Sequence, residues 1–199
     1  MENVTAERAR LDPDIRRAQL VGLGVQMLAS RSLDQVPVDE IAAAAGISRG
    51  LLFHYFPSKR DFHVAVAQAA ADDFLAETEG DPSLPIGEQL HDGLDRYVRY
   101  VEEHQPGYMA HVRGAAGGDE LMARVFEQTR SRIVERMLAA LDHQDPPAIL
   151  ALAVRGWVAM CEETTVEWLR QPRVTREAVI ELLEQALVEL LALALAPHR

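Results

Sequence analysis

The chain has 199 residues, of which 48% are hydrophobic and 26% charged, a balance that favours a folded globular protein over wholesale disorder. No apolar run is long enough to span a bilayer, no secretory leader is visible, and the single cysteine, Cys161, excludes an internal disulfide. The net charge of −11 arises entirely after residue 62, because residues 1–62 hold as many basic as acidic side chains. We therefore expect a cytoplasmic protein with no membrane contact, and its charge alone neither indicates nor excludes DNA binding.

Apolar residues recur at three- and four-residue spacing along almost the whole chain, which predicts an all-α fold. A first helix is expected from Pro13 to about Arg31, with five residues facing inward: Ile15, Leu20, Leu23, Met27 and Leu28. Short helices are then expected over residues 38–45 and 49–56, and a long helix capped by Ser58 should end near Glu79. After a linker at residues 80–85, the expected helices cover residues 86–104, 106–116, 119–141, 147–169 and 175–196.

The stretch at residues 36–59, VPVDEIAAAAGISRGLLFHYFPSK, contains two short helices joined by Gly46-Ile47-Ser48. A glycine-containing turn of this length is typical of helices that cross steeply. Two apolar faces follow, one formed by Val38, Ile41, Ala42 and Ala45 and the next by Ile47, Leu52, Phe53 and Phe56. Ser48 is expected to cap the second helix, whose outer face is left to Arg49, Leu51, His54 and Tyr55. The turn alone would equally fit an ordinary helical hairpin inside a bundle.

The aromatic sequence HYF before Pro-Ser-Lys, following this turn, resembles the signature of the TetR family of transcriptional regulators. The matching residues are Val38, Ile41, Ala42, Ala45, Gly46, Ile47, Ser48, Gly50, Leu52, Phe53, Tyr55, Phe56 and Lys59. The resemblance implies an all-α subunit with an N-terminal three-helix DNA-binding domain that contains a helix-turn-helix, over residues 1–62. It also implies a C-terminal helical domain for effector binding and dimerisation, over residues 63–199.

The same resemblance assigns the DNA contacts. Arg49 and His54 correspond to base readers, Ser48 and Tyr55 to phosphate contacts, and Lys59 to a phosphate anchor. The full expected DNA-binding set is Ser48, Arg49, Gly50, Leu51, His54, Tyr55 and Lys59. Two positions depart from the family pattern. Leu51 replaces a small hydroxyl residue and is expected to touch a thymine methyl group, and Pro37 replaces a Ser or Thr cap.

The last two predicted helices carry apolar residues on more than one face, so we expect the final helix to be buried on two sides. Its apolar stripe comprises Val179, Leu182, Leu183, Ala186, Leu190 and Leu193, widened by Ile180, Leu187, Leu191 and Leu195. The preceding helix offers Leu152, Gly156, Ala159 and Met160. A large core within one subunit would explain this pattern. The resemblance favours a four-helix interface between two subunits, and a homodimer suits a palindromic operator.

An aromatic face on the same helices indicates a ligand pocket, although plain core is the alternative. Trp157, Cys161, Thr164 and Trp168 share one face, which Tyr97, Val101, Tyr108, His111 and Phe126 could oppose. The expected ligand-binding set is Tyr97, Tyr108, His111, Phe126, Trp157, Cys161 and Trp168. The acidity of this domain favours a neutral or cationic, partly aromatic effector unless Arg113 or Arg130 faces the pocket.

No metal-binding spacing, phosphate loop or nucleophile motif is present, so we expect no metal, no cofactor and no catalytic residue. Glu162 and Glu163 are expected to be a solvated pair of charges. The sequence thus predicts a repressor that holds double-stranded operator DNA as a homodimer and is released by a small-molecule effector. The alternatives are a helical-bundle enzyme or carrier with a purely structural hairpin, an activator, and a regulator controlled by a protein partner.

Overall fold

A computed structural model describes residues 12–28, 31, 33–116, 120–141 and 146–196, and within these ranges it contains helices and no strand. The α-helices are α1 (Pro13–Leu28), α2 (Val38–Ala44), α3 (Arg49–Tyr55), α4 (Lys59–Glu77), α5 (Ile86–Glu103), α6 (Gln105–Ala116), α7 (Glu120–Ala140), α8 (Ala148–Arg170) and α9 (Arg176–Leu195). The predicted all-α fold is confirmed, with helix ends within a few residues of those expected. A single turn of 3-10 helix, Leu33–Gln35, was not expected.

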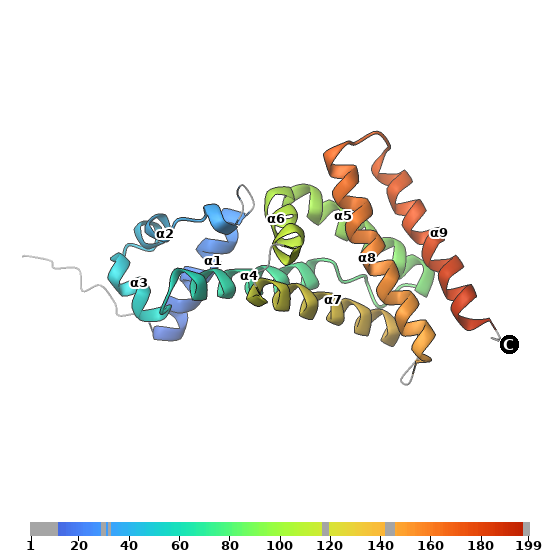
Figure 1. The fold of residues 1–199 in the computed structure, drawn as a ribbon, viewed down its shortest axis with the longest axis horizontal. Coiled ribbons are helices and arrows are strands. Elements are labelled where there is room, and N and C mark those ends of the chain that lie inside the picture. The colour runs from blue at the N-terminus through green and yellow to red at the C-terminus, as the bar shows by residue number, and fades with distance from the viewer. Residues whose placement is uncertain (1–11, 29–30, 32, 117–119, 142–145, 197–199) are drawn as a thin grey trace, which may run out of the picture.

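Helices α1, α2 and α3 pack with the start of α4 to form the head of the molecule, at the left of Figure 1. Phe56 and Phe62 meet edge to face in its core, with ring centroids 5.1 Å apart. The fully buried side chains around them are Leu20, Val36, Ile41, Leu52 and Val66. The prediction for Ile15 is wrong, because its side chain is 58% exposed. It lies five residues before Leu20, about 140° round the helix from that core residue.

Local capping fixes where the short helices begin and end. Gly46 has a φ of +66°, a left-handed conformation that ends α2 and that residues with a side chain rarely adopt. The Ser48 hydroxyl accepts a hydrogen bond from the Leu51 amide at 3.2 Å, and the Ser58 hydroxyl caps α4 through the Asp61 amide at 3.1 Å. Pro37 precedes α2 without any side-chain cap, as expected. The head is therefore specified largely by contacts within a few residues.

Helix α4 leaves the head and continues into the second bundle, where it packs along α7 (Figure 1). The predicted boundary between residues 62 and 63 falls inside this continuous helix, so the division into two domains stays a prediction. Helices α8 and α9 form a closely packed pair at the other side of the molecule. Trp157 and Leu183 are buried between them, and the indole of Trp157 donates to the Leu183 carbonyl at 2.8 Å.

A second connection between the two parts lies at Gly107, near the start of α6. A side-chain carbon placed on Gly107 would come within 2.9 Å of the Leu28 carbonyl oxygen at the end of α1. Only glycine permits so close an approach of the two backbones. The head thus meets the second bundle along α4, at the α1–α6 contact, and where the turn Leu33–Gln35 packs on α6. None of the helices within the described ranges has the length and apolar character needed to cross a membrane.

Candidate DNA-reading face, ligand cavity and dimer face

The predicted DNA-binding residues lie on α3, on its N-cap, or at the start of α4. Ser48, Arg49, Gly50, Leu51, His54 and Lys59 are exposed and Tyr55 is half-buried. Leu52 points the opposite way and is fully buried against the head. Burial of this inner face orients the outer one, so α3 presents a row of polar side chains around the exposed Leu51. That arrangement is suited to entering a major groove.

Arg49 is held by a neighbour that the sequence analysis missed. One terminal nitrogen of its guanidinium contacts both carboxylate oxygens of Asp39 on α2, at 2.7 and 3.0 Å. The guanidinium carbon also lies 5.4 Å from the ring centre of Phe53. Asp39 and Arg49 are both well exposed, so this pair adds little stability. In this arrangement the guanidinium of Arg49 lies against α2 and Phe53.

A cavity of about 1350 Å³ extends from the junction with the head into the second bundle, lined by residues from α4 through α9 with Leu33 and a few from α1. Five of the predicted ligand-binding residues line it: Tyr97, Tyr108, Phe126, Trp157 and Cys161. Trp168 does not, since it lies near the end of α8 and its indole donates to the Val174 carbonyl at 2.9 Å. Val101 is fully buried in the core and Thr164 lies off the cavity. The side chain of His111 lies outside the described part of the structure.

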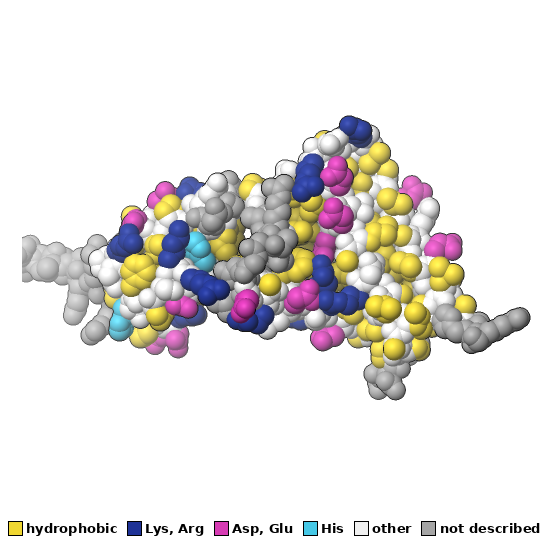
Figure 2. All heavy atoms as spheres, in the orientation of Figure 1, with side chains coloured by type: hydrophobic (Ala, Val, Ile, Leu, Met, Phe, Trp, Pro, Cys, Tyr) yellow, Lys and Arg dark blue, Asp and Glu magenta, His cyan; other side chains and the backbone are white. Residues whose placement is uncertain are grey.

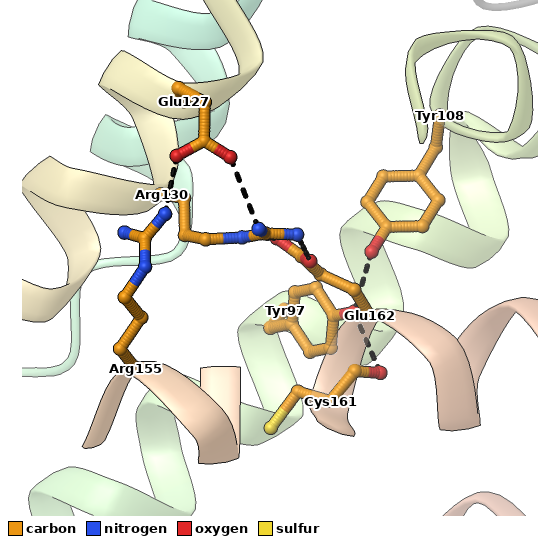
Figure 3. Close-up of polar contacts among 7 residues, drawn as sticks. All are labelled: Tyr97, Tyr108, Glu127, Arg130, Arg155, Cys161 and Glu162. Atoms are coloured by element: carbon orange, nitrogen blue, oxygen red, sulfur yellow. Dashed lines mark hydrogen bonds and ion pairs between the residues drawn. The ribbon is translucent and has the colours of Figure 1, made fainter. Parts of the chain in front are cut away.

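Two tyrosines place neutral polar groups on the cavity wall (Figure 3). The hydroxyl oxygens of Tyr97 and Tyr108 are 2.7 Å apart, and Tyr97 also donates to the Cys161 carbonyl at 3.3 Å. Burial raises the pKa of both phenols well above the ordinary value, and it raises the pKa of the Cys161 thiol as well. All three groups therefore remain protonated at neutral pH. They can orient a ligand by hydrogen bonding but supply neither a nucleophile nor a base.

The expectation for Glu162 is wrong, because this carboxylate is not solvated. It forms an ion pair with Arg130 on the cavity wall, and Arg130 also contacts Glu127 at 3.2 Å while Glu127 binds Arg155 (Figure 3). Burial raises the pKa of Glu162, and its pairing with Arg130 acts in the opposite direction. Glu163, one residue on, is exposed as expected. A one-residue step on a helix is enough to separate a buried partner from a surface charge.

The cavity wall contains several residues that the sequence analysis did not identify. They include Phe74 on α4, Tyr100 on α5, His104 directly after α5, and Thr129, Arg136 and Met137 on α7. The periodic aromatic residues of α5 and α8 were a usable signal, whereas no pattern marked which side of α4 faces the cavity, and of the expected ligand-binding set only Phe126 lies on α7. Among the residues that the structure describes, no group of histidine, cysteine or acidic side chains is placed to hold a metal ion.

A third surface lies on α8 and α9, where hydrophobic side chains spread over the face seen in Figure 2. The large exposed apolar residues of these helices are Ile149, Leu152, Leu182, Val188, Leu193 and Leu195. The predicted stripe of α9 is therefore divided. Leu183 is fully buried inside the subunit, whereas Leu193 is 67% exposed. On α8, no neighbouring side chain comes within 4 Å of a side-chain carbon built at Gly156. A patch of this kind marks a surface for association.

Two family models match the chain. Residues 21–66 match the N-terminal domain described as bacterial regulatory proteins of the tetR family. Residues 86–190 match the model described as the C-terminal domain of tetracyclin repressor-like proteins. The first segment contains α2, α3 and the turn between them, and the second covers α5 to most of α9. The two matches together take in the reading face and most of the cavity.

A solved structure of a tetR-family transcriptional regulator from Streptomyces coelicolor is similar over nearly the whole chain. It is 36% identical, with a TM-score of 0.83, and the alignment covers 94% of this chain and 84% of that one. Two curated proteins of Mycolicibacterium smegmatis are more distant. The transcriptional activator FasR is 27% identical over 50% of this chain and 46% of its own length. The transcriptional regulator EthR is 25% identical over 66% of this chain and 60% of its own length. The chain thus matches less than two thirds of these curated relatives.

Proposed function

Because the chain belongs to the TetR family of transcriptional regulators, we propose that it is a ligand-responsive repressor released from its operator by a small molecule. The observation that carries the proposal is one continuous helix, α4, which joins a polar reading face to a large apolar cavity. Such a protein acts where the DNA is, in the cytoplasm of a bacterial cell. We assign it no catalytic role, since the similar proteins named above are regulators.

Operator binding is proposed to run through α3. Arg49 and His54 read base edges in the major groove, Leu51 contacts a thymine methyl group, and Lys59 holds a phosphate. To reach a guanine, the Arg49 guanidinium exchanges at least part of its contact with Asp39 for the base. Asp39 thereby selects against weak, non-specific partners, because it competes for the same guanidinium.

Dimerisation is proposed to use the exposed apolar residues of α8 and α9. Six large side chains on these helices face solvent in the single subunit, which is costly unless a partner covers them. A two-fold pairing of this face places two copies of α3 on a palindromic operator. Release then requires that the effector bind the DNA-free conformation more tightly than the DNA-bound one.

A DNA mobility shift tests the core of this proposal. The purified protein is titrated against the DNA upstream of its own gene and against a shuffled duplex of equal length and composition. We expect a discrete complex with the upstream DNA at concentrations where the shuffled duplex stays free. A helical carrier or enzyme with a structural hairpin would show no sequence preference, and that result would remove the proposal.

The sign of regulation needs a separate measurement, because the curated relative FasR is named an activator. A reporter gene placed behind the bound operator is assayed with and without the regulator. Higher reporter expression in its absence is the result expected of a repressor. Lower expression would assign an activator that uses the same reading face.

A further inference from the structure

Arg136 on α7 is a cation on the cavity wall with an unusual set of partners. Its guanidinium donates to two main-chain carbonyls near the end of α4, those of Leu75 at 2.8 Å and Thr78 at 3.3 Å. No carboxylate of the described residues lies within ion-pair distance of it. Arg130, the other arginine of α7 on this wall, is by contrast paired with Glu162.

Burial lowers the pKa of Arg136, yet a guanidinium stays charged at any physiological pH. A half-buried positive charge held by carbonyls alone lacks the counter-charge that such groups usually have. Glu79, also on the cavity wall, is near enough for its charge to act on Arg136 but forms no ion pair with it. Two carbonyl contacts leave part of the guanidinium fork open to a further acceptor.

The charges on the cavity wall are not evenly distributed. The described lining contains Lys59, Arg60, Arg130 and Arg136 against Asp73, Glu77, Glu79 and Glu162. Lys59 and Arg60 belong to the first turn of α4, about 24 Å along that helix from Leu75, which Arg136 contacts. The case for an anionic effector therefore rests on Arg136 itself, the cation of this wall that has no carboxylate partner among the described residues. Arg130 does face the cavity, the condition under which the expectation of a neutral or cationic molecule was to be relaxed.

The rest of the cavity wall indicates what kind of body the ligand has beyond its charged group. The cavity lining includes apolar side chains of one hydrophobic cluster, namely Leu90, Leu94, Ile133, Met137, Leu187 and Leu191. Its volume of about 1350 Å³ exceeds the range of about 300–1,000 Å³ that is usual for small-molecule pockets. Such a space fits a long or bulky apolar body better than a compact polar metabolite.

Resting on the proposed function, we infer that the effector is an amphiphilic monocarboxylate whose carboxylate binds Arg136 and whose apolar body fills the cavity. A planar carboxylate matches the open edge of a guanidinium. A dianionic headgroup fits less well, because the nearby Glu79 carboxylate would repel its second negative charge as well as its first.

The same contact gives the ligand a route to α4. Arg136 binds carbonyls at the end of α4, so a carboxylate on the open part of its guanidinium draws the same side chain toward the ligand and weakens these two hydrogen bonds. Weakening of these bonds loosens the junction of α4 with α7. The headgroup thus acts directly on the helix that leads to the reading face.

The test compares two probes of equal length, decanoate and decanol, by calorimetric titration of the full chain below the concentration at which either probe self-associates. We expect decanoate to bind about tenfold to a hundredfold more tightly, the effect of one charge-assisted contact. Equal affinity for the two probes, or no binding of either, would overturn the inference. Operator binding without any probe, measured on the same samples, tests the proposed function separately.

Two variants locate the effect. Arg136→Gln should abolish the preference for decanoate and leave the affinity for decanol unchanged. Arg132→Gln is the matched control, because Arg132 also bridges α7 to α4, through Asp72, but lies outside the cavity. A preference that survives in a folded Arg136→Gln protein would overturn the inference. If Arg136→Gln does not fold, Glu79→Gln provides the test. Removing this negative charge should tighten the binding of decanoate and leave the affinity for decanol unchanged. An unchanged affinity for decanoate would overturn the inference.

Discussion

The reading head and the effector cavity differ in how their working residues are spread along the chain. The DNA-reading set falls between Ser48 and Lys59, within one helix, its cap and the residue that begins the next. The cavity instead draws on residues from Val25 to Leu191 and on nearly every helix. A function carried by one short helix leaves a compact motif in the sequence. A function carried by the packing of many helices leaves only scattered residues, and its chemistry becomes readable once the helices are in place.

The largest effect is expected from a charge at the proposed dimer face of α8 and α9, because the proposed roles of the reading head and of the cavity both require a dimer. Leu193→Glu places a charge on the exposed part of α9, where a partner subunit would bury it. We expect a folded monomer, with dimerisation weakened by at least about 3 kcal/mol, more than a hundredfold. Sedimentation velocity measures the assembly and circular dichroism the fold.

Leu183→Glu is the matched control, because this side chain is fully buried within the subunit. It should unfold the chain rather than dissociate a folded dimer. A wild-type protein that sediments as a monomer and still binds a full operator tightly would show that the α8–α9 face has another purpose.

The next largest effect is expected from loss of a base contact in the head, and it tests whether α3 reads the bases. Arg49→Ala should weaken operator binding by about 1–3 kcal/mol and relax its specificity. Arg31→Ala removes a comparable exposed ion pair, with Glu40, away from α3 and should keep the specificity. Fluorescence anisotropy with operator and single-base variants at fixed salt gives both quantities. Unchanged discrimination in Arg49→Ala would show that another face of the head reads the bases.

Lys59 is expected to act on every DNA sequence alike. It is the only lysine of the chain and the first residue of α4, exposed beside the reading helix. Lys59→Ala should lower affinity for operator and shuffled DNA equally and reduce the salt slope of log K by about one. Titrations at several salt concentrations measure this slope. An effect on the operator alone would instead assign Lys59 to base reading.

The smallest effect probes the cavity through Glu162. Because burial raises its pKa in the folded chain, folding is favoured most where this carboxyl is protonated. That contribution is full below the ordinary pKa of glutamate and is lost as pH rises through the raised value. The difference in unfolding free energy between wild type and Glu162→Gln should therefore fall across this window. Urea unfolding at a series of pH values measures it, and a difference that increases with pH would mean that Arg130 outweighs burial.

The sequence predicted features that depend on neighbouring residues better than features that depend on how distant helices pack. Gly46, Ser48 and Ser58 were interpreted correctly because each acts on residues at most a few positions away. The outcome for α9 was divided, since Leu182 is 52% exposed and Leu183 is fully buried. Which of two adjacent leucines faces the core depends on the rotation of α9 against α8 and α5. No pattern within α9 itself encodes that rotation.

Chemistry inside the cavity was harder still to anticipate. The pairing of Glu162 with Arg130 joins residues 32 positions apart, and Arg136 reaches carbonyls 58 and 61 positions away. Main-chain carbonyls leave no mark in the sequence, so nothing identified Arg136 as a cation without a carboxylate partner. The predicted aromatic residues fared better, because four of them reach a common space, one each from α5, α6, α7 and α8.

The close approach of Gly107 to Leu28 determines how the head can move. A rigid body attached along one rod, here α4, retains a twist about the axis of that rod. Contacts away from the axis remove this freedom while they hold, and they lie where the end of α1 and the turn Leu33–Gln35 meet α6. A displacement of α6 that opens all of these contacts would return a single torsional motion to the head. In a dimer, opposite twists of the two heads would turn the paired α3 helices out of register with successive major grooves, even with the distance between the heads unchanged.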